Sequence, residues 1–186
     1  MGFTAEDFDL IIEDMAALGK EPTYCMGDDI PLAVLSDKPH LLYDYFKQRF
    51  AQVTNPPIDP LREKLVMSLE MHLGERRPAL KPQPEAASVI HLETPVLNEA
   101  ELAAISDRGL LVKTVSTQVA VESCAGGLQQ AIAALCSVAE QAVRDGAQVL
   151  VLSDRVDGTG AAAQLTPTTA AMPALLAVGA VHHHLL

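Results

Sequence analysis

Gln148-Val-Leu-Val-Leu-Ser153 is the stretch that decides the fold class of this 186-residue chain. Such a continuous apolar run is typical of a strand buried on both faces of a parallel sheet. A β-branched run at 110–116 precedes it, and an Ala-rich helical pattern at 128–145 separates the two. Because parallel strands need a crossover connection, the pattern predicts a βαβ unit and an α/β fold.

The same pattern predicts that the α/β domain is incomplete. Residues 173–186 are rich in Ala, Leu and Val and predict a helix that runs to the last residue. A helix that follows a buried parallel strand should lead to another strand. We therefore expect the C-terminal part, 98–186, to be a truncated βαβα segment. A Pro-rich connector, 78–97, precedes it.

The N-terminal part, 1–77, predicts helices joined by rigid loops. Thr4 and Asp7 fit a weak capping box, and Asp59-Pro60 fits the start of a later helix. Three apolar stripes at helical spacing predict buried faces. Their members are Phe8, Ile11, Ile12, Met15 and Leu18; Leu42, Tyr45, Phe46 and Phe50; and Leu61, Leu65, Leu69 and Leu73.

Composition excludes several classes of function. The chain is 49% hydrophobic with a formal net charge of -11, and its apolar runs are too short to span a bilayer. An acidic surface disfavours nucleic acid, anionic membrane and acidic protein partners. Three widely spaced cysteines without a CxxC pair indicate reduced thiols in a reducing compartment, which favours a soluble cytoplasmic protein.

The candidate chemical groups each have a structural explanation that is at least as good. Cys25 has no His within ten residues to act as a base, so we expect a packed loop cysteine. Asp28 and Asp29 suit turn and cap chemistry better than a cation site. Consecutive helical residues point about 100° apart, so 182–184 cannot place three His around one metal. Ser153-Asp154-Arg155 follows the buried strand, where ligand sites occur in α/β folds, but also suits loop capping.

Long stretches resemble the central domain of glutamate synthase. The resemblance is dense over 19–36, 39–63 and 66–69, and later markers are 153–155 and 174–184. It implies a degenerate (βα) barrel-like domain that lacks a cofactor of its own. It also implies a parent enzyme with an amidotransferase domain, an FMN barrel with a 3Fe-4S cluster, and ferredoxin or an NAD(P)H-oxidising subunit as electron donor. The parent would be cytoplasmic, or in the plastid stroma of a photosynthetic eukaryote.

In that family ammonia released from glutamine crosses an internal tunnel and is added to 2-oxoglutarate, and the iminium is reduced to glutamate. The resemblance therefore implies that this chain links two active sites and is inactive alone. We expect the loop around Glu21 to Asp29 to face the tunnel, with Thr23 as the best candidate. The full set of tunnel or interface candidates is Thr23, Cys25, Met26, Gly27, Asp28, Asp29 and Asn55.

Two other functions stay open from the sequence. The chain could be a free-standing assembly module that binds an amidotransferase partner. It could also be an independent barrel-type enzyme that uses Asp154 and a His near the C-terminus. The linking domain predicts no flavin absorbance and no turnover by the isolated chain, whereas the independent enzyme requires turnover.

Overall fold

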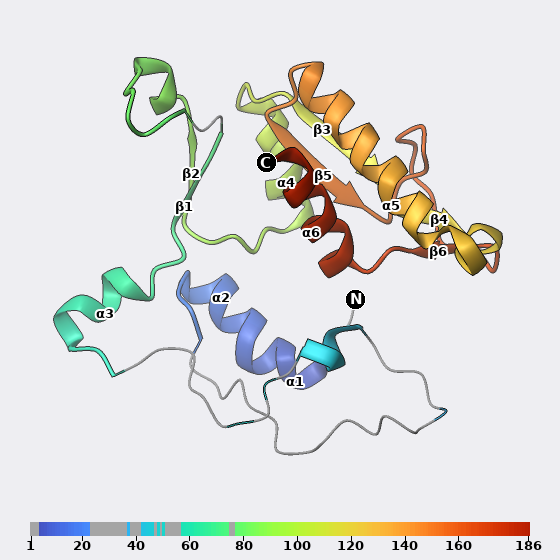
Figure 1. Cartoon of the computed structure of the whole chain (residues 1–186). Coiled ribbons are helices and arrows are strands. Elements are labelled where there is room, and N and C mark those ends of the chain that lie inside the picture. The colour runs from blue at the N-terminus through green and yellow to red at the C-terminus, as the bar shows by residue number, and fades with distance from the viewer. Residues whose placement is uncertain are drawn as a thin grey trace. The chain divides into compact units, whose positions relative to one another are not determined.

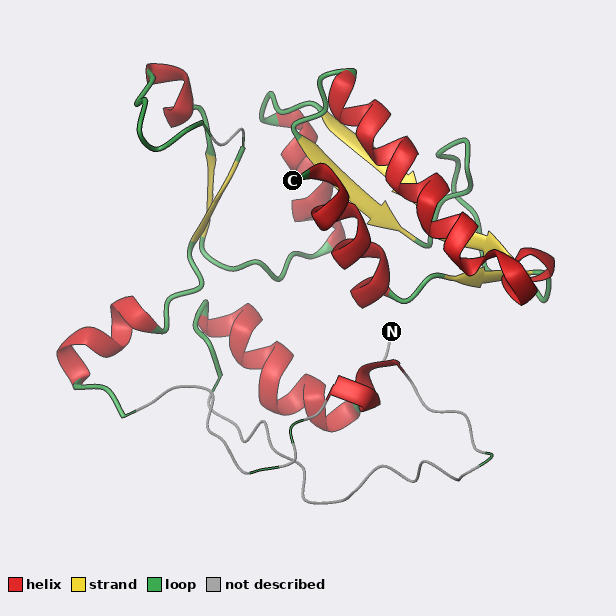
Figure 2. Cartoon of the chain, in the orientation of Figure 1, coloured by secondary structure: helices red, strands yellow, loops and turns green. Residues whose placement is uncertain are grey.

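The computed structural model describes residues 4–22, 37, 42–46, 48, 50, 57–74 and 77–186. The chain divides into two compact units (Figures 1 and 2). Unit 1 comprises Met1–Leu73 and Ala87–Glu101, and unit 2 comprises Gly74–Ala86 and Leu102–Leu186. Each unit is described by itself below.

Unit 2 contains the βαβα segment that the sequence predicts. Its elements are β3 (Val112–Ser116), α5 (Val121–Arg144), β5 (Val149–Ser153) and α6 (Ala174–Leu185). The strands pair in parallel from Val112 opposite Val149 to Ser116 opposite Ser153. Helices α5 and α6 lie side by side over one face of this pair (Figure 1). The described strands form two-stranded sheets, so parallel pairing is confirmed but no closed barrel is present among them.

The core of unit 2 lies between the two helices and the strands. Val115, Leu150 and Leu152 point toward the helices, as the period of two requires. Ala139 and Ala177 are fully buried, which lets α5 and α6 approach closely. The buried cluster consists of Val115, Leu135, Cys136, Ala139, Met172, Ala177 and Val181.

The start of α5 differs from the prediction. The helix begins at Val121 rather than near residue 128, so Gly126-Gly127 lies inside it and not in an entry loop. A short antiparallel pair, β4 (Gln118–Ala120) with β6 (Thr169–Ala171), was also absent from the prediction. The Val121 N–H donates to the Thr168 carbonyl at 2.9 Å, so this strand pair fixes where α5 starts. Tertiary contacts thus override the low helix propensity of glycine.

Unit 1 contains shorter elements, and two more lie at or near the unit boundaries. In unit 1 they are α1 (Ala5–Asp7), η1 (Phe8–Ile12), α2 (Glu13–Leu18), η2 (Leu42–Phe46), α3 (Pro60–Val66), β1 (Met71–Leu73) and β2 (Ile90–Leu92); the others are η3 (Pro84–Ala87) and α4 (Glu99–Asp107). Strands β1 and β2 pair in antiparallel fashion.

Local capping signals in the sequence are confirmed. The Thr4 hydroxyl accepts the Asp7 N–H at 3.2 Å, and the Asp7 carboxylate accepts the Thr4 N–H at 2.8 Å. Asp59 caps α3 with Pro60 in its first turn. Asn98 and Glu101 form the reciprocal pair that opens α4.

The first apolar stripe is not one buried face, contrary to the prediction. Element η1 is a π-helix, which holds more residues per turn than an α-helix. Residues after it are therefore rotated relative to those before it. Ile11, Ile12 and Met15 are half-buried, whereas Phe8 and Leu18 are 50% and 59% exposed.

The other two stripes of unit 1 are also wrong as core predictions. Leu61 and Leu65 are 93% and 82% exposed, and α3 ends at Val66 rather than at Gly74. The chain becomes extended there because residues 67–69 pair with residues 19–21. Tyr45, Phe46 and Phe50 are exposed as well. Element η2 is a 3-10 helix of five residues, which is too short to bury that stripe.

Among the described helices, none combines the length and the apolarity that crossing a bilayer requires.

We predict that Ala139→Leu destabilises unit 2 by about 1–3 kcal/mol, because the fully buried Ala139 leaves no room for added methylenes. Urea unfolding followed by circular dichroism measures the change. Ala133→Leu, at an exposed position of the same helix, is the matched control and should change the free energy of unfolding by less than about 0.5 kcal/mol. Equal effects of the two substitutions would contradict the packing described here.

We predict that Glu140 stabilises the contact between α5 and α6 at neutral pH and not in acid. Hydrogen bonds from Arg144 and then from His184, at 3.0 Å, lower the pKa of Glu140 below its usual 4.5. A lowered carboxyl pKa adds stability above pH 4.5, and this stability is lost as pH falls through the lowered pKa. Glu140→Gln should therefore unfold more easily than the parent chain at about pH 7, and this difference should shrink as the pH falls through the lowered pKa. A destabilisation that persists unchanged in acid would refute this.

Candidate functional site

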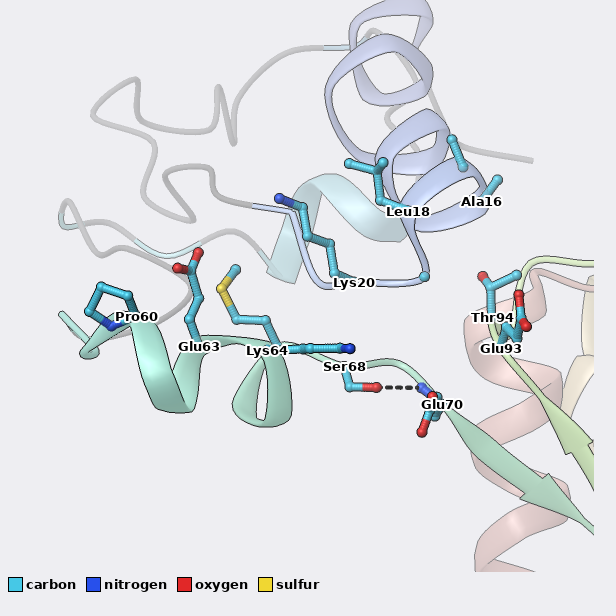
Figure 3. A pocket seen from close by; sticks show the side chains of 13 residues that line it. Ala16, Leu18, Lys20, Pro60, Glu63, Lys64, Ser68, Glu70, Glu93 and Thr94 are labelled. Atoms are coloured by element: carbon cyan, nitrogen blue, oxygen red, sulfur yellow. Dashed lines mark hydrogen bonds between the residues drawn. The ribbon is translucent and has the colours of Figure 1, made fainter.

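Unit 1 holds a hollow of about 460 Å³ between the end of α2 and one side of α3. Residues Glu93 and Thr94, which follow β2, also line it. Figure 3 shows Glu63 extending from α3 toward the segment that carries Lys20. The charged side chains around it are Lys20, Glu63, Lys64, Glu70 and Glu93.

Three hydrogen bonds to backbone carbonyls hold the walls of this hollow together. The Glu21 N–H donates to the Met67 carbonyl at 2.8 Å, and the Leu69 N–H donates to the Gly19 carbonyl at 2.9 Å. The Thr94 hydroxyl donates to the carbonyl of Met15 at 2.7 Å. The hollow is therefore built by segments far apart in the sequence, which explains why no local pattern predicted it.

Gly19 is the residue that allows this arrangement. It ends α2 with φ of 58°, in the left-handed region that favours glycine. A Cβ at this position would lie 2.7 Å from the Glu93 carbonyl oxygen. The sequence predicted Gly19 as a helix stop, but only the structure shows the close approach of Glu93.

The tunnel candidates predicted from the sequence lie outside the described residues: they are Thr23, Cys25, Met26, Gly27, Asp28, Asp29 and Asn55. The chain on either side of them is described. Pro22 is buried beside the first of these segments, and Asp59 caps α3 after the last. Residues that line the hollow, such as Lys20 and Pro60, are therefore close in sequence to the predicted loop surface.

The hollow offers binding groups but no described pair of nucleophile and base. Its hydroxyls are occupied, since Ser68 Oγ accepts the Glu70 N–H at 3.2 Å and the Thr94 hydroxyl is bound as above. Among the described residues, no group of three or more His, Cys, Asp or Glu is placed to hold a metal ion. Lysine and glutamate are depleted in the core of protein interfaces, so these side chains suit the polar rim of a contact with another surface.

A second hollow, of about 570 Å³, lies in unit 2 between β3, α5 and the loop after β5. Asp157 lines it and accepts hydrogen bonds from the Thr159 hydroxyl at 2.6 Å and from the Thr159 and Ala161 N–H groups. These bonds, the hydroxyl first, lower the pKa of Asp157. The Asp-Gly-Thr-Gly run at 157–160 is typical of such a turn. It was not among the candidate sites predicted from the sequence.

The other candidates serve structural roles in unit 2. The Asp154 carbonyl accepts a hydrogen bond from Gln118 Nε2 at 2.7 Å, and Ser153 Oγ accepts the Arg155 N–H at 3.1 Å. His184 Nε2 lies 3.0 Å from Glu140 Oε2. The structure therefore does not show Asp154 and His184 together at one substrate site.

The described residues do not suit the flavin and the iron–sulfur cluster that the resemblance implies for a parent enzyme. An iron–sulfur cluster needs several cysteines close together. The chain has three, and the Cys136 thiol is packed in the core of unit 2. A flavin phosphate needs free backbone N–H groups or cations. At the strand ends of unit 2, the Asp157 carboxylate already accepts the local N–H groups and would repel a phosphate.

We predict that Gly19→Ala destabilises unit 1 by more than about 1 kcal/mol, since the added Cβ meets a backbone oxygen in a left-handed residue. Gly179→Ala is the matched control: it lies in α6 with open space around it and should stabilise the chain by about 0.5–1 kcal/mol. Amide hydrogen exchange of residues 67–69 reports on the hollow directly. Unchanged exchange there in Gly19→Ala would contradict the geometry.

Comparison with known proteins identifies the chain. The model of the glutamate synthase central domain matches residues 1–186. Ferredoxin-dependent glutamate synthases from Oryza sativa subsp. japonica and Synechocystis sp. are each 56% identical over the whole chain, and one from Arabidopsis thaliana is 55% identical. The chain spans 11–12% of the length of these relatives. It belongs to the family of glutamate synthase central domains.

Proposed function

We propose that this chain is the central linking segment of a ferredoxin-dependent glutamate synthase. The observation that carries the proposal is 56% identity over the whole chain to relatives that bear this name. Since the chain spans about a tenth of their length, the remaining domains supply the chemistry. In the parent these would be the glutamine amidotransferase domain and the FMN domain with its 3Fe-4S cluster, which serve glutamate biosynthesis and ammonia assimilation.

The described residues do not suit a flavin or an iron–sulfur cluster, and this supports a non-catalytic role for the chain. Hydrogen bonds occupy the described hydroxyls of the first hollow, and the Asp157 turn occupies the second. The relatives are named as chloroplastic or come from a cyanobacterium, among others, which supports a plastid or cytoplasmic parent. Ferredoxin as electron donor follows from the same names. The acidic chain itself is not the surface that docks it.

Unit 2 supplies the rigid part of this segment. Helices α5 and α6 cover one face of β3 and β5, and the strands leave their outer edges unpaired in the described part of the chain. A parallel pair of this kind is the repeating element of a (βα) barrel. We propose that residues 98–186 are part of a degenerate barrel whose further strands lie elsewhere in the parent. Residues 1–77 then form the helical, loop-rich part, and 78–97 the connector.

Unit 1 supplies the surface next to the ammonia route. Ammonia needs a path lined by small or neutral groups that do not retain a cation. Thr23 is such a group, one residue after the buried Pro22. The ties of Glu21 to Met67 and of Gly19 to Leu69 hold the chain just before it.

The two other functions are less well supported. An independent barrel-type enzyme would need Asp154 and a C-terminal His free for substrate, whereas His184 is bonded to Glu140 in another part of unit 2. A free-standing assembly module would not account for the match to one part of much longer relatives.

The test uses Thr23→Val in the parent enzyme, with Thr159→Val in the Asp157 turn of unit 2 as a control for a threonine outside the predicted tunnel candidates. We expect Thr23→Val to raise the ratio of glutamine consumed to glutamate formed, since a wall without this hydroxyl is less polar and lets ammonia escape. Glutaminase activity alone should be retained. Tight coupling in Thr23→Val, or equal loss of coupling in both variants, would overturn the tunnel assignment.

A further inference from the structure

The N-terminal helical segment of unit 1, residues 4–18, carries a ridge of side chains that the apolar pattern of the sequence does not predict. Glu6, Leu10, Asp14 and Leu18 follow one another at four-residue spacing. Leu10 and Leu18 are 54% and 59% exposed. Ile11 and Met15, on the neighbouring face, are half-buried, and the Met15 carbonyl accepts the Thr94 hydroxyl. Asp14, between the two exposed leucines, is half-buried. The segment is therefore attached to unit 1 by one face and exposes the two leucines of this ridge on another.

The π-helix η1 creates the ridge. In a regular α-helix, Leu18 would lie on the same face as Ile11 and Met15, and Leu10 would lie apart. The wider turn of Phe8–Ile12 rotates the following residues backward by close to one residue's angle. Leu18 thereby turns away from Ile11 and comes into line with Leu10. Single π turns occur often at functional sites, because they reposition side chains at a cost in stability.

The charge of the segment defines the chemistry of a partner. Between residues 4 and 18 the acidic side chains are Glu6, Asp7, Asp9, Glu13 and Asp14, and the sequence has no Lys or Arg there. Two leucines separated by eight residues lie roughly 12 Å apart along a helix. A complementary surface thus has two apolar pockets at this separation and Lys or Arg beside them. Acidic surfaces, nucleic acid and a second copy of this chain, at net charge -11, are disfavoured by repulsion.

We propose that the ridge of Glu6, Leu10, Asp14 and Leu18 docks into a basic-rimmed apolar groove on another part of the same parent polypeptide. The inference rests on the proposed function, in which this chain is one segment of a longer protein. The chain spans about 11% of its relatives' length, so a groove in the same polypeptide is present at high effective concentration. Leu18 also lines the first hollow, so the ridge leads directly to its rim.

The experiment places the photo-crosslinking residue p-benzoylphenylalanine at position 10 or 18 of the full-length parent enzyme. Mass spectrometry then identifies the partner peptide. We expect both positions to crosslink to peptides outside 1–186 that contain Lys or Arg. The control position is Leu80 in unit 2, which is 96% exposed and off the ridge. Crosslinks confined to residues 1–186, crosslinks to a second copy, or the same products from position 80 would overturn the proposal.

A charge series tests the electrostatic part. Asp14→Lys should lower the crosslinking yield from position 18 about tenfold, because like charges then face each other across the contact. Asp14→Asn should lower it less. Glu13→Lys makes the same change at the adjacent exposed position off the ridge, and should have the smaller effect. Equal effects at positions 13 and 14 would overturn the groove assignment. Circular dichroism of each variant checks that folding is retained.

This experiment is separable from the test of the proposed function. Coupling of glutamine use to glutamate formation in Thr23→Val does not depend on where positions 10 and 18 crosslink. A failed tunnel assignment thus leaves the crosslinks unchanged. Crosslinks confined to 1–186 leave the coupling result intact.

Discussion

The close packing of α5 on α6 over the parallel strands is the constraint on which unit 2 depends. Ala139 and Ala177 are fully buried at this contact, and larger side chains there would push the helices apart. Val115, Leu150 and Leu152 fill the space beneath. Since α5 is continuous from Val121 to Arg144, it packs against β4 as well as β3, and the Asp157 turn lines the hollow beside them.

Unit 1 is built on a different principle. Among its described residues, Met67 and Ile90 are the buried hydrophobic ones, and the other large apolar side chains are half-buried or, like Leu61 and Leu65, exposed. Its described segments are held by backbone hydrogen bonds, such as that from Glu21 to Met67, and by helix caps such as Thr4 with Asp7. A segment that exposes leucines in this way has apolar surface to bury against a partner, which agrees with a linking role in a larger enzyme.

In the proposed linking role the two units contribute differently. In unit 2, Gln118 donates a hydrogen bond to the Asp154 carbonyl and the Ser116 hydroxyl donates one to the Val156 carbonyl, both next to the strand ends. Unit 1 carries the hollow next to Gly19, the anchored start of the loop at Pro22 and the acidic ridge.

The sequence by itself determined the features that depend on neighbours along the chain. The run 148–153 predicted the parallel strand, and the caps at Thr4 and Asp59 predicted two helix starts, because capping bonds join residues only two or three apart. It also carried the family resemblance, since 56% identity is a property of the sequence alone.

Only the tertiary structure decided which apolar stripes are buried. Periodicity gives the face on which side chains lie, but not whether another element covers that face. Leu61 and Leu65 were therefore wrong as core residues. The π turn at Phe8–Ile12 rotated Leu18 out of its stripe, and Gly19 met Glu93 across 74 residues of sequence. These outcomes depend on contacts between distant segments, which no local pattern records.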